Sequence, residues 1–113
     1  MIERQHAGRD ASLSELFEIL SHKHRRHVLW VLAHPDTRTD ATISATRFTD
    51  TGDEPDVLQL ALRHNHLPKL DDHGLVDWDP EAETLARGPR FDGVEPFLSL
   101  MDDNEEEIPQ DWP

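Results

Sequence analysis

Apolar residues recur with a helical spacing in the first third of the chain. Between residues 13 and 20 they stand at i, i+3, i+4 and i+7, which is one stripe of a helix: Leu13, Leu16, Phe17 and Leu20. Ser12 precedes this stripe and fits a capping box with Glu15. A second helix is expected over residues 22–34, capped by Ser21 and ended by Pro35. Residues 1–11 show no periodicity, and we expect them to form a flexible arm.

The middle of the chain contains one weak and one strong helical pattern. In the threonine-rich stretch 36–56, Ile43 and Phe48 favour a short helix over about residues 42–48. Apolar residues return from residue 57 and predict a helix over 55–73, for which Pro55 suits the first helical position. Pro68 is expected to kink this helix, because it has no N–H and its ring crowds the carbonyl four residues back. Gly74 is expected to end it in the left-handed conformation.

The last third combines a hairpin pattern, a helix and an acidic tail. Residues 75–79 and 84–88 flank a turn-rich segment and predict two short strands around a turn. Apolar residues from Phe91 to Met101 again have helical spacing, so a closing helix is expected over about 90–101. The acidic residues 102–113 offer little to a core and are expected to be disordered. The chain therefore divides into a flexible arm (1–11), one folded domain (12–101) and an acidic disordered tail (102–113).

The order of these elements is that of a winged helix-turn-helix. Helices precede a two-stranded hairpin and a closing helix; in such domains one helix enters the major groove and the hairpin reaches the adjacent backbone. Residues 16–29 resemble the opening of archaeal and bacterial winged-helix regulators, L..L....R..IL, and residues 64–76 resemble the exit of their recognition helix, HL..L...GLV. Because the exit has the form His-x-His-Leu-Pro-Lys-Leu, residues 12–100 resemble a haloarchaeal winged helix-turn-helix domain family related to ArsR-like regulators.

This resemblance implies a mainly α fold with a small β-hairpin: a three-helix core, a wing and a closing C-terminal helix. It implies a DNA-binding transcriptional regulator that reads double-stranded DNA through the helix at about 56–73, with phosphate contacts from the wing. The resemblance also places Leu62, Leu67 and Leu70 inward, which exposes His64 and Asn65 to the groove. Asn65 then suits adenine N6 and N7, and His64 suits guanine or a phosphate.

Charge alone favours other contacts with DNA. Arg63 lies on the opposite side of the same helix, and an arginine bidentate to guanine is the commonest specific contact, so both faces remain open. Phosphate contacts position a protein without specifying a sequence. The residues with suitable charge for them are Lys69, Arg87, Arg90, Lys23, Arg25 and Arg26. Those in the second helix would equally well balance Glu15 or Glu18 on a solvated face.

The distribution of charge matters more to this hypothesis than its total. The chain has 24 acidic and 11 basic residues, and a formal net charge of -13. Such an excess of acid with only two lysines is typical of proteins from a salt-saturated cytoplasm, where a Debye length of about 3 Å screens self-repulsion. Residues 71–113 alone have a formal charge of -12, so residues 1–70 are nearly neutral. In molar salt phosphate contacts contribute less, and a DNA reader would depend on base edges.

Other classes of function lack their characteristic residues. The absence of cysteine excludes disulfides and thiolate zinc sites. His24 and His27 share a helix face, but no full ligand set accompanies them, so neither a metal nor a cofactor is expected. There is no Gly-rich phosphate loop and no nucleophile elbow, so an enzyme is not expected. No apolar run reaches the ~18 residues of a membrane span and no signal peptide is recognised, so we expect a cytoplasmic protein without a membrane partner.

Three hypotheses follow from these patterns. The first is a homodimeric regulator whose subunits meet through the apolar residues of the closing helix, Phe91 to Met101. The second is a winged-helix protein–protein interaction or dimerisation module without DNA binding, with the acidic tail and Trp112 as contacts to a protein partner. The third is an acidic DNA mimic. The remaining tryptophans are expected to be packing residues, Trp30 against the first helix and Trp78 on the hairpin.

Overall fold

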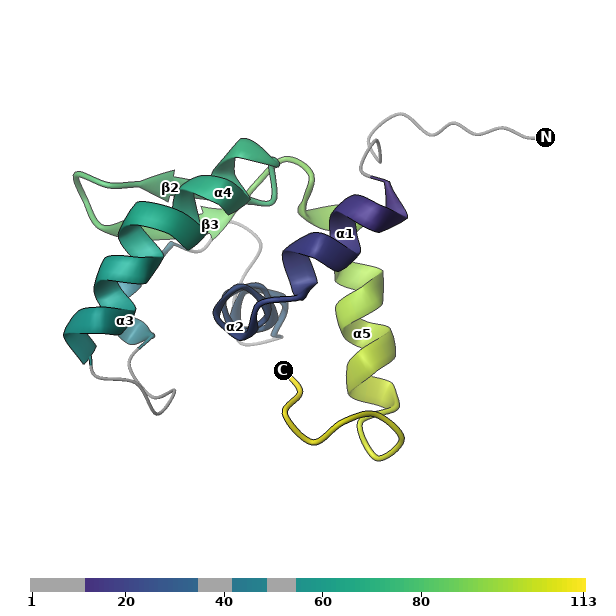
Figure 1. Ribbon diagram of the computed structural model, residues 1–113. Coiled ribbons are helices and arrows are strands. Elements are labelled where there is room, and N and C mark those ends of the chain that lie inside the picture. The colour runs from purple at the N-terminus through teal and green to yellow at the C-terminus, as the bar shows by residue number, and fades with distance from the viewer. Residues whose placement is uncertain (1–11, 35–41, 49–54) are drawn as a thin grey trace.

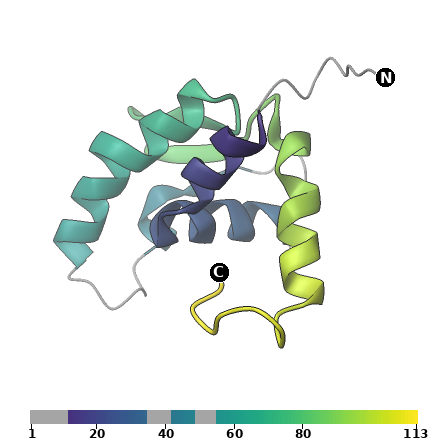
Figure 2. The same ribbon diagram turned by 45° about the vertical axis from the view of Figure 1, so that its right-hand side comes forward.

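The computed structural model describes residues 12–34, 42–48 and 55–113 and is mainly helical with a small antiparallel sheet (Figure 1). In both views α5 stands on the opposite side of α1 and α2 from α3 (Figure 2). The helices and strands are α1 (Leu13–Leu20), α2 (Lys23–Ala33), β1 (Ile43–Ser44), the 3-10 turn η1 (Ala45–Arg47), α3 (Pro55–Ala61), the π-helical segment η2 (Leu62–His66), α4 (Leu67–Asp72), β2 (Val76–Asp79), β3 (Thr84–Arg87), the 3-10 turn η3 (Phe91–Gly93) and α5 (Glu95–Asp103).

The first helix begins as predicted but buries a different stripe. The Ser12 hydroxyl accepts a hydrogen bond from the Glu15 N–H at 3.0 Å, which satisfies one of the orphan donors of α1. The buried side chains are those of Leu16, Ile19 and Leu20, whereas Leu13 and Phe17 are each 54% exposed. Ile19 therefore takes the inward place that the sequence pattern gave to Phe17, and α1 keeps an apolar edge open to solvent.

The second helix has a different cap from the predicted one. Ser21 closes α1, because its hydroxyl donates to the Glu18 carbonyl at 2.6 Å. His22 is the N-cap of α2, and its Nδ1 accepts from the His24 N–H at 3.3 Å. The helix then ends at Ala33, close to the predicted end.

The short helix predicted over residues 42–48 is replaced by a strand and a 3-10 turn. Ile43 and Ser44 form β1, which pairs antiparallel with Leu85 and Thr84 of β3. The Ser44 hydroxyl then accepts from the Thr46 N–H at 3.2 Å and begins η1. The predicted hairpin of β2 and β3 is confirmed, but β1 enlarges it to a sheet with the order β1-β3-β2.

The predicted helix over 55–73 is confirmed, but a π-helical segment interrupts it. We call α3, η2 and α4 together the helical path. Pro68 would leave the His64 carbonyl without its usual partner and would crowd it. The chain instead widens into a π turn just before the proline, in which the Leu67 N–H donates to the Leu62 carbonyl. Gly74 ends the path with a φ of +76°, as predicted, and the Leu75 N–H donates to the Leu70 carbonyl at 3.0 Å.

The chain after α5 folds back instead of extending freely. Trp112 packs against the core, and its Nε1 donates to the Asp102 Oδ1 at 2.8 Å. Trp30 was expected to be a packing residue; it is half-buried against the core, and its Nε1 donates to the two oxygens of the same Asp102 at 2.8 and 3.1 Å. In both views the C-terminal segment turns from the end of α5 toward α1 and α2 (Figures 1 and 2). The described part of the tail therefore differs from the disorder predicted over 102–113.

The core lies between α1, α2, the helical path, the sheet and α5. It consists of buried apolar side chains that come from every layer, among them Ile19, Leu29, Phe48, Leu58, Leu62, Leu85, Phe91 and Leu98. No helix in residues 12–34, 42–48 or 55–113 is long and apolar enough to cross a membrane.

Substituting Gly88 by alanine is expected to lower the free energy of unfolding by about 2 kcal/mol. A Cβ at this position would stand 2.4 Å from the Gly74 carbonyl oxygen and 2.7 Å from the Val76 nitrogen, and both are backbone atoms that cannot rotate away. Gly93→Ala is the matched control, because a Cβ there meets nothing within 4 Å. Urea denaturation of both variants checks the prediction, and equal midpoints for the two would contradict it.

Candidate functional site

Two polar side chains stand out from the otherwise buried middle of the helical path. His64 and Asn65 are exposed in the π segment, whereas Leu62, His66 and Leu67 on either side of them are buried. Leu62, Leu67 and Leu70 are all buried, as the resemblance to winged-helix regulators implied. His64 and Asn65 are therefore the two side chains of this segment that can reach a partner in solution.

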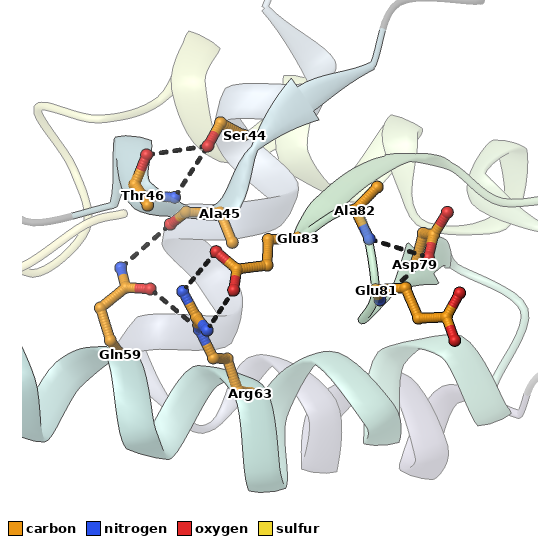
Figure 3. A network of polar contacts seen from close by, with 9 residues as sticks. All are labelled: Ser44, Ala45, Thr46, Gln59, Arg63, Asp79, Glu81, Ala82 and Glu83. Atoms are coloured by element: carbon orange, nitrogen blue, oxygen red, sulfur yellow. Dashed lines mark hydrogen bonds and ion pairs between the residues drawn. The ribbon is translucent and has the colours of Figure 1, made fainter.

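Arg63 lies beside them but points toward the hairpin. Its guanidinium binds the Glu83 carboxylate in a bidentate pair, with Nη1–Oε2 and Nη2–Oε1 distances of 2.8 and 2.9 Å (Figure 3). Its Nε also contacts the Gln59 side-chain oxygen at 3.4 Å. The bidentate fork that a guanine would need is thus occupied by a residue of the same chain. The interpretation that places Arg63 on a base edge is not supported by this geometry.

The Arg63–Glu83 pair also joins the helical path to the sheet. Glu83 lies in the turn between β2 and β3 with a φ of 58°, and its carbonyl accepts from the Ala45 N–H at 2.9 Å. Gln59, one turn before Arg63, donates to the Ala45 carbonyl at 3.0 Å (Figure 3). The helix, η1 and the hairpin turn are consequently connected to one another by side chains. Neither Glu83 nor Gln59 was predicted as a site residue, because no local sequence signal marks a partner 20 residues away.

Arg25 and Arg26, predicted as phosphate contacts, are used to close α1. Arg25 is only 6% exposed, and its guanidinium donates to the carbonyls of Ile19 and Glu18 at 2.8 and 3.0 Å. Arg26 donates to the Leu20 carbonyl at 2.8 Å. The last carbonyls of a helix have no partner within it, and two adjacent arginines at the start of α2 are well placed to supply donors. The prediction for Arg25 is therefore wrong, since its charge is buried in the fold.

Two of the other predicted phosphate contacts, Arg87 and Lys69, are also engaged within the chain. Lys23 and Arg90 are exposed. The Arg87 Nε donates to the Leu32 carbonyl at 2.9 Å, and its guanidinium lies 4.8 Å from the centre of the Phe91 ring. Its Nη1 forms an ion pair with Glu95 at 3.5 Å. Lys69 forms an ion pair with Glu18 at 3.4 Å, although one third of its side chain is exposed. Arg87 joins the sheet to α2 and α5, while Lys69 retains access to solvent.

Three histidine rings meet at the junction of α2 with the helical path. The ring of buried His66 lies 4.1 Å from that of His22 and 5.6 Å from that of His24, and the Arg25 Nη1 is 3.5 Å from the His66 Nδ1. Burial lowers the pKa of His66 to about 4, and the positive charges of His22, Arg25 and His24 add to this effect. Burial and His24 likewise lower the pKa of His22. His22 and His66 are therefore held toward their neutral forms, and with His24 and the charged Arg25 they form a packed cluster rather than an accessible cationic patch.

This cluster differs from the arrangement that the sequence suggested. The spacing of His24 and His27 pointed to one helix face, but the ring that joins His24 comes from another helix, 42 positions away in the chain. Within the residues that the structure describes, no group of three or more His, Asp or Glu side chains is arranged to hold a metal ion.

Comparison with known families assigns most of this region to one domain. A family model described as a domain of unknown function, DUF7344, matches residues 17–86, which is more than half of the chain. The chain belongs to the DUF7344 family. Comparisons with curated proteins and with solved structures give no match.

The DUF7344 segment contains the features described above except Arg87, its partners Phe91 and Glu95, and Arg90. It begins within α1 and ends within β3, so it includes His64, Asn65, the Arg63–Glu83 pair and the histidine cluster. The end of β3, helix α5 and the C-terminal segment lie outside the match.

Proposed function

We propose that this DUF7344 domain is a winged helix-turn-helix that binds double-stranded DNA as a transcriptional regulator. The observation that carries the proposal is the exposure of His64 and Asn65 on a helical path whose leucines are buried. A hairpin follows that path directly, as a wing follows a recognition helix, and η1 occupies the place of the preceding helix. Sequence and fold thus favour one face of the molecule for DNA.

The chemistry of the two side chains suits base edges. An asparagine amide pairs in a bidentate manner with adenine N6 and N7, and an imidazole donates to guanine acceptors or to a phosphate. Arg63 and Glu83 act in this proposal as positioning residues, because their pair fixes the hairpin turn relative to the helix. Lys69 is the predicted phosphate contact on the same path, and one third of its side chain is exposed.

The proposal includes a homodimer from the cytoplasm of a halophilic archaeon. Two half-sites compensate for a surface with few cations, because each recognition helix adds its own base contacts. Leu100 on α5 is 58% exposed, and Leu13 on α1 is 54% exposed. These side chains are the proposed contacts between subunits. The halophilic origin rests on the net charge of -13 and the scarcity of lysine.

The double variant His64→Ala and Asn65→Ala tests the proposal. Its affinity for genomic DNA fragments enriched by the unmodified protein is expected to fall by at least about 30-fold, because two base-edge contacts of on the order of 1 kcal/mol or more each are lost. Fluorescence anisotropy in about 2 M KCl measures this affinity under conditions where phosphate contacts contribute little. Ser99→Ala with Gln110→Ala is the matched control, since both positions are exposed, polar and distant in the chain.

Two results would contradict DNA reading by this surface. One is an unchanged affinity in the double variant, and the other is the absence of any enriched fragment. In the second case the domain would act as a protein interaction or dimerisation module without DNA binding.

A further inference from the structure

The C-terminal segment and three helices line an open cavity that the proposed DNA surface does not use. Its volume is about 330 Å³, within the range of small-molecule sites. Phe17 and Leu20 of α1 and Met101 of α5 line one side. Ile108 and Trp112 of the C-terminal segment line the other.

A few specific contacts hold the C-terminal segment that forms one wall of the cavity. Trp112 donates to Asp102 at 2.8 Å, next to the indole of Trp30 that uses the same carboxylate. A turn from Asn104 to Glu107 brings the chain back toward α1. The wall is therefore formed by the fold of this chain, but by a segment without a helix or strand of its own.

Arg26 supplies the cationic group among the lining residues. One of its nitrogens donates to the Leu20 carbonyl at 2.8 Å and is thereby fixed. The other terminal nitrogen faces the Asp111 carboxylate at 3.7 Å, which is beyond hydrogen-bond distance. The Asp111 side chain is 78% exposed, so this ion pair is screened by solvent and easily exchanged.

We propose that this cavity binds a small carboxylate with an apolar body. The apolar part would lie between Phe17, Met101 and Trp112. The carboxylate would replace Asp111 at the second nitrogen of Arg26 and could form a shorter, charge-assisted hydrogen bond there. This inference does not depend on DNA binding, because the cavity lies on α1, α5 and the C-terminal segment rather than on the helix bearing His64 and Asn65.

Octanoate is the first probe, with octan-1-ol and octylammonium as controls of the same length. Backbone amide chemical shifts and the fluorescence of the tryptophans report binding to the full chain. Octanoate is expected to bind about 10-fold more tightly than octylammonium, since only the carboxylate can pair with Arg26. 1-Naphthoate, in a parallel titration, distinguishes a preference for a rigid aromatic body from one for a flexible aliphatic body.

Variants of the ion pair test the position of the carboxylate. Asp111→Asn removes the competing anion, so octanoate affinity is expected to rise about threefold while octan-1-ol affinity stays the same. Arg26→Gln and Arg26→Lys both lose the guanidinium contact with Leu20, but only the lysine keeps the charge. Octanoate is expected to bind about 10-fold more weakly to the glutamine variant than to the lysine variant.

Met101→Trp tests the position of the apolar body, because the larger side chain fills the cavity. Binding of octanoate and octan-1-ol is expected to be lost in this variant, while its amide spectrum remains that of a folded protein. Equal binding of octanoate and octylammonium, unchanged binding in Met101→Trp, or no binding to the unmodified chain would overturn the proposal. Light scattering distinguishes one further overturning result, in which a second copy of the chain covers the cavity and excludes the probe.

Discussion

Replacing Arg25 by alanine is expected to lower the free energy of unfolding by about 3 kcal/mol. The guanidinium is buried and donates to the carbonyls of Glu18 and Ile19 at the end of α1. Each hydrogen bond from a charged group contributes about 1.5–3 kcal/mol, and its loss leaves a carbonyl without a donor. Alanine also leaves a void beside the His66 ring, which Arg25 contacts at 3.5 Å.

Guanidinium chloride or urea denaturation measures this loss directly. Arg47→Ala is the matched control, because Arg47 is an exposed arginine in η1 and removes the same formal charge from the chain. A similar small effect of both substitutions would show that Arg25 acts as a surface cation, as the sequence first suggested. A large effect of Arg25→Ala alone would assign it to the closure of α1.

Lowering the pH from about 7 to about 4.5 is expected to destabilise the protein through His66, by up to about 3 kcal/mol. The pKa of His66 is about 4 in the folded chain and near 6.5 in the unfolded chain. Between these values the unfolded chain binds the proton that the folded chain refuses, so stability rises with pH. The contribution is fully present above about pH 6.5 and is lost as the pH falls toward 4. Because His66 is 1% exposed, solvent screening reduces this effect little.

The groups that face His66 all oppose its protonation. They are His22, His24 and Arg25, which come from the start of α2. The Glu18 carboxylate lies 3.7 Å from the Arg25 Nη2 and pairs with that cation.

His66→Gln removes the titration but retains an acceptor for Arg25. The fall in unfolding free energy between about pH 7 and pH 4.5 is expected to be about 2 kcal/mol smaller in this variant. His64→Gln is the matched control, because it changes an exposed ring two residues away. An identical fall in the unmodified protein and in His66→Gln would contradict the assignment.

Local signals in the sequence predicted the features that depend on local interactions. The Ser12 cap, the left-handed Gly74 and the hairpin around residues 80–83 each follow from a few neighbouring residues, and all are present. The π turn before Pro68 was anticipated as a kink, because a proline conflicts with its own helix wherever that helix packs.

Interactions between distant segments accounted for the errors. β1 has only two residues, and its partners stand about 40 positions later, so its pattern alone resembled a weak helix. Arg25 looked like a surface cation, because the open carbonyls at the end of α1 are visible only when α2 turns against it. The family resemblance implied that His64 and Asn65 face outward, and both are exposed in the structure, where Leu62 and Leu67 are buried.

Several arginines direct their charge into the fold, and this changes the charge of the surface that water contacts. Arg25, Arg63 and Arg87 direct their charge at carbonyls and carboxylates within the fold, while Asp103, Glu105 and Glu106 are exposed. The face that water meets is therefore more acidic than the formal charge of -13 suggests. Dissolved potassium ions gather around such a face and neutralise it, as lysines do on less acidic proteins. Lowering the salt concentration weakens this screening and increases the repulsion between the exposed carboxylates.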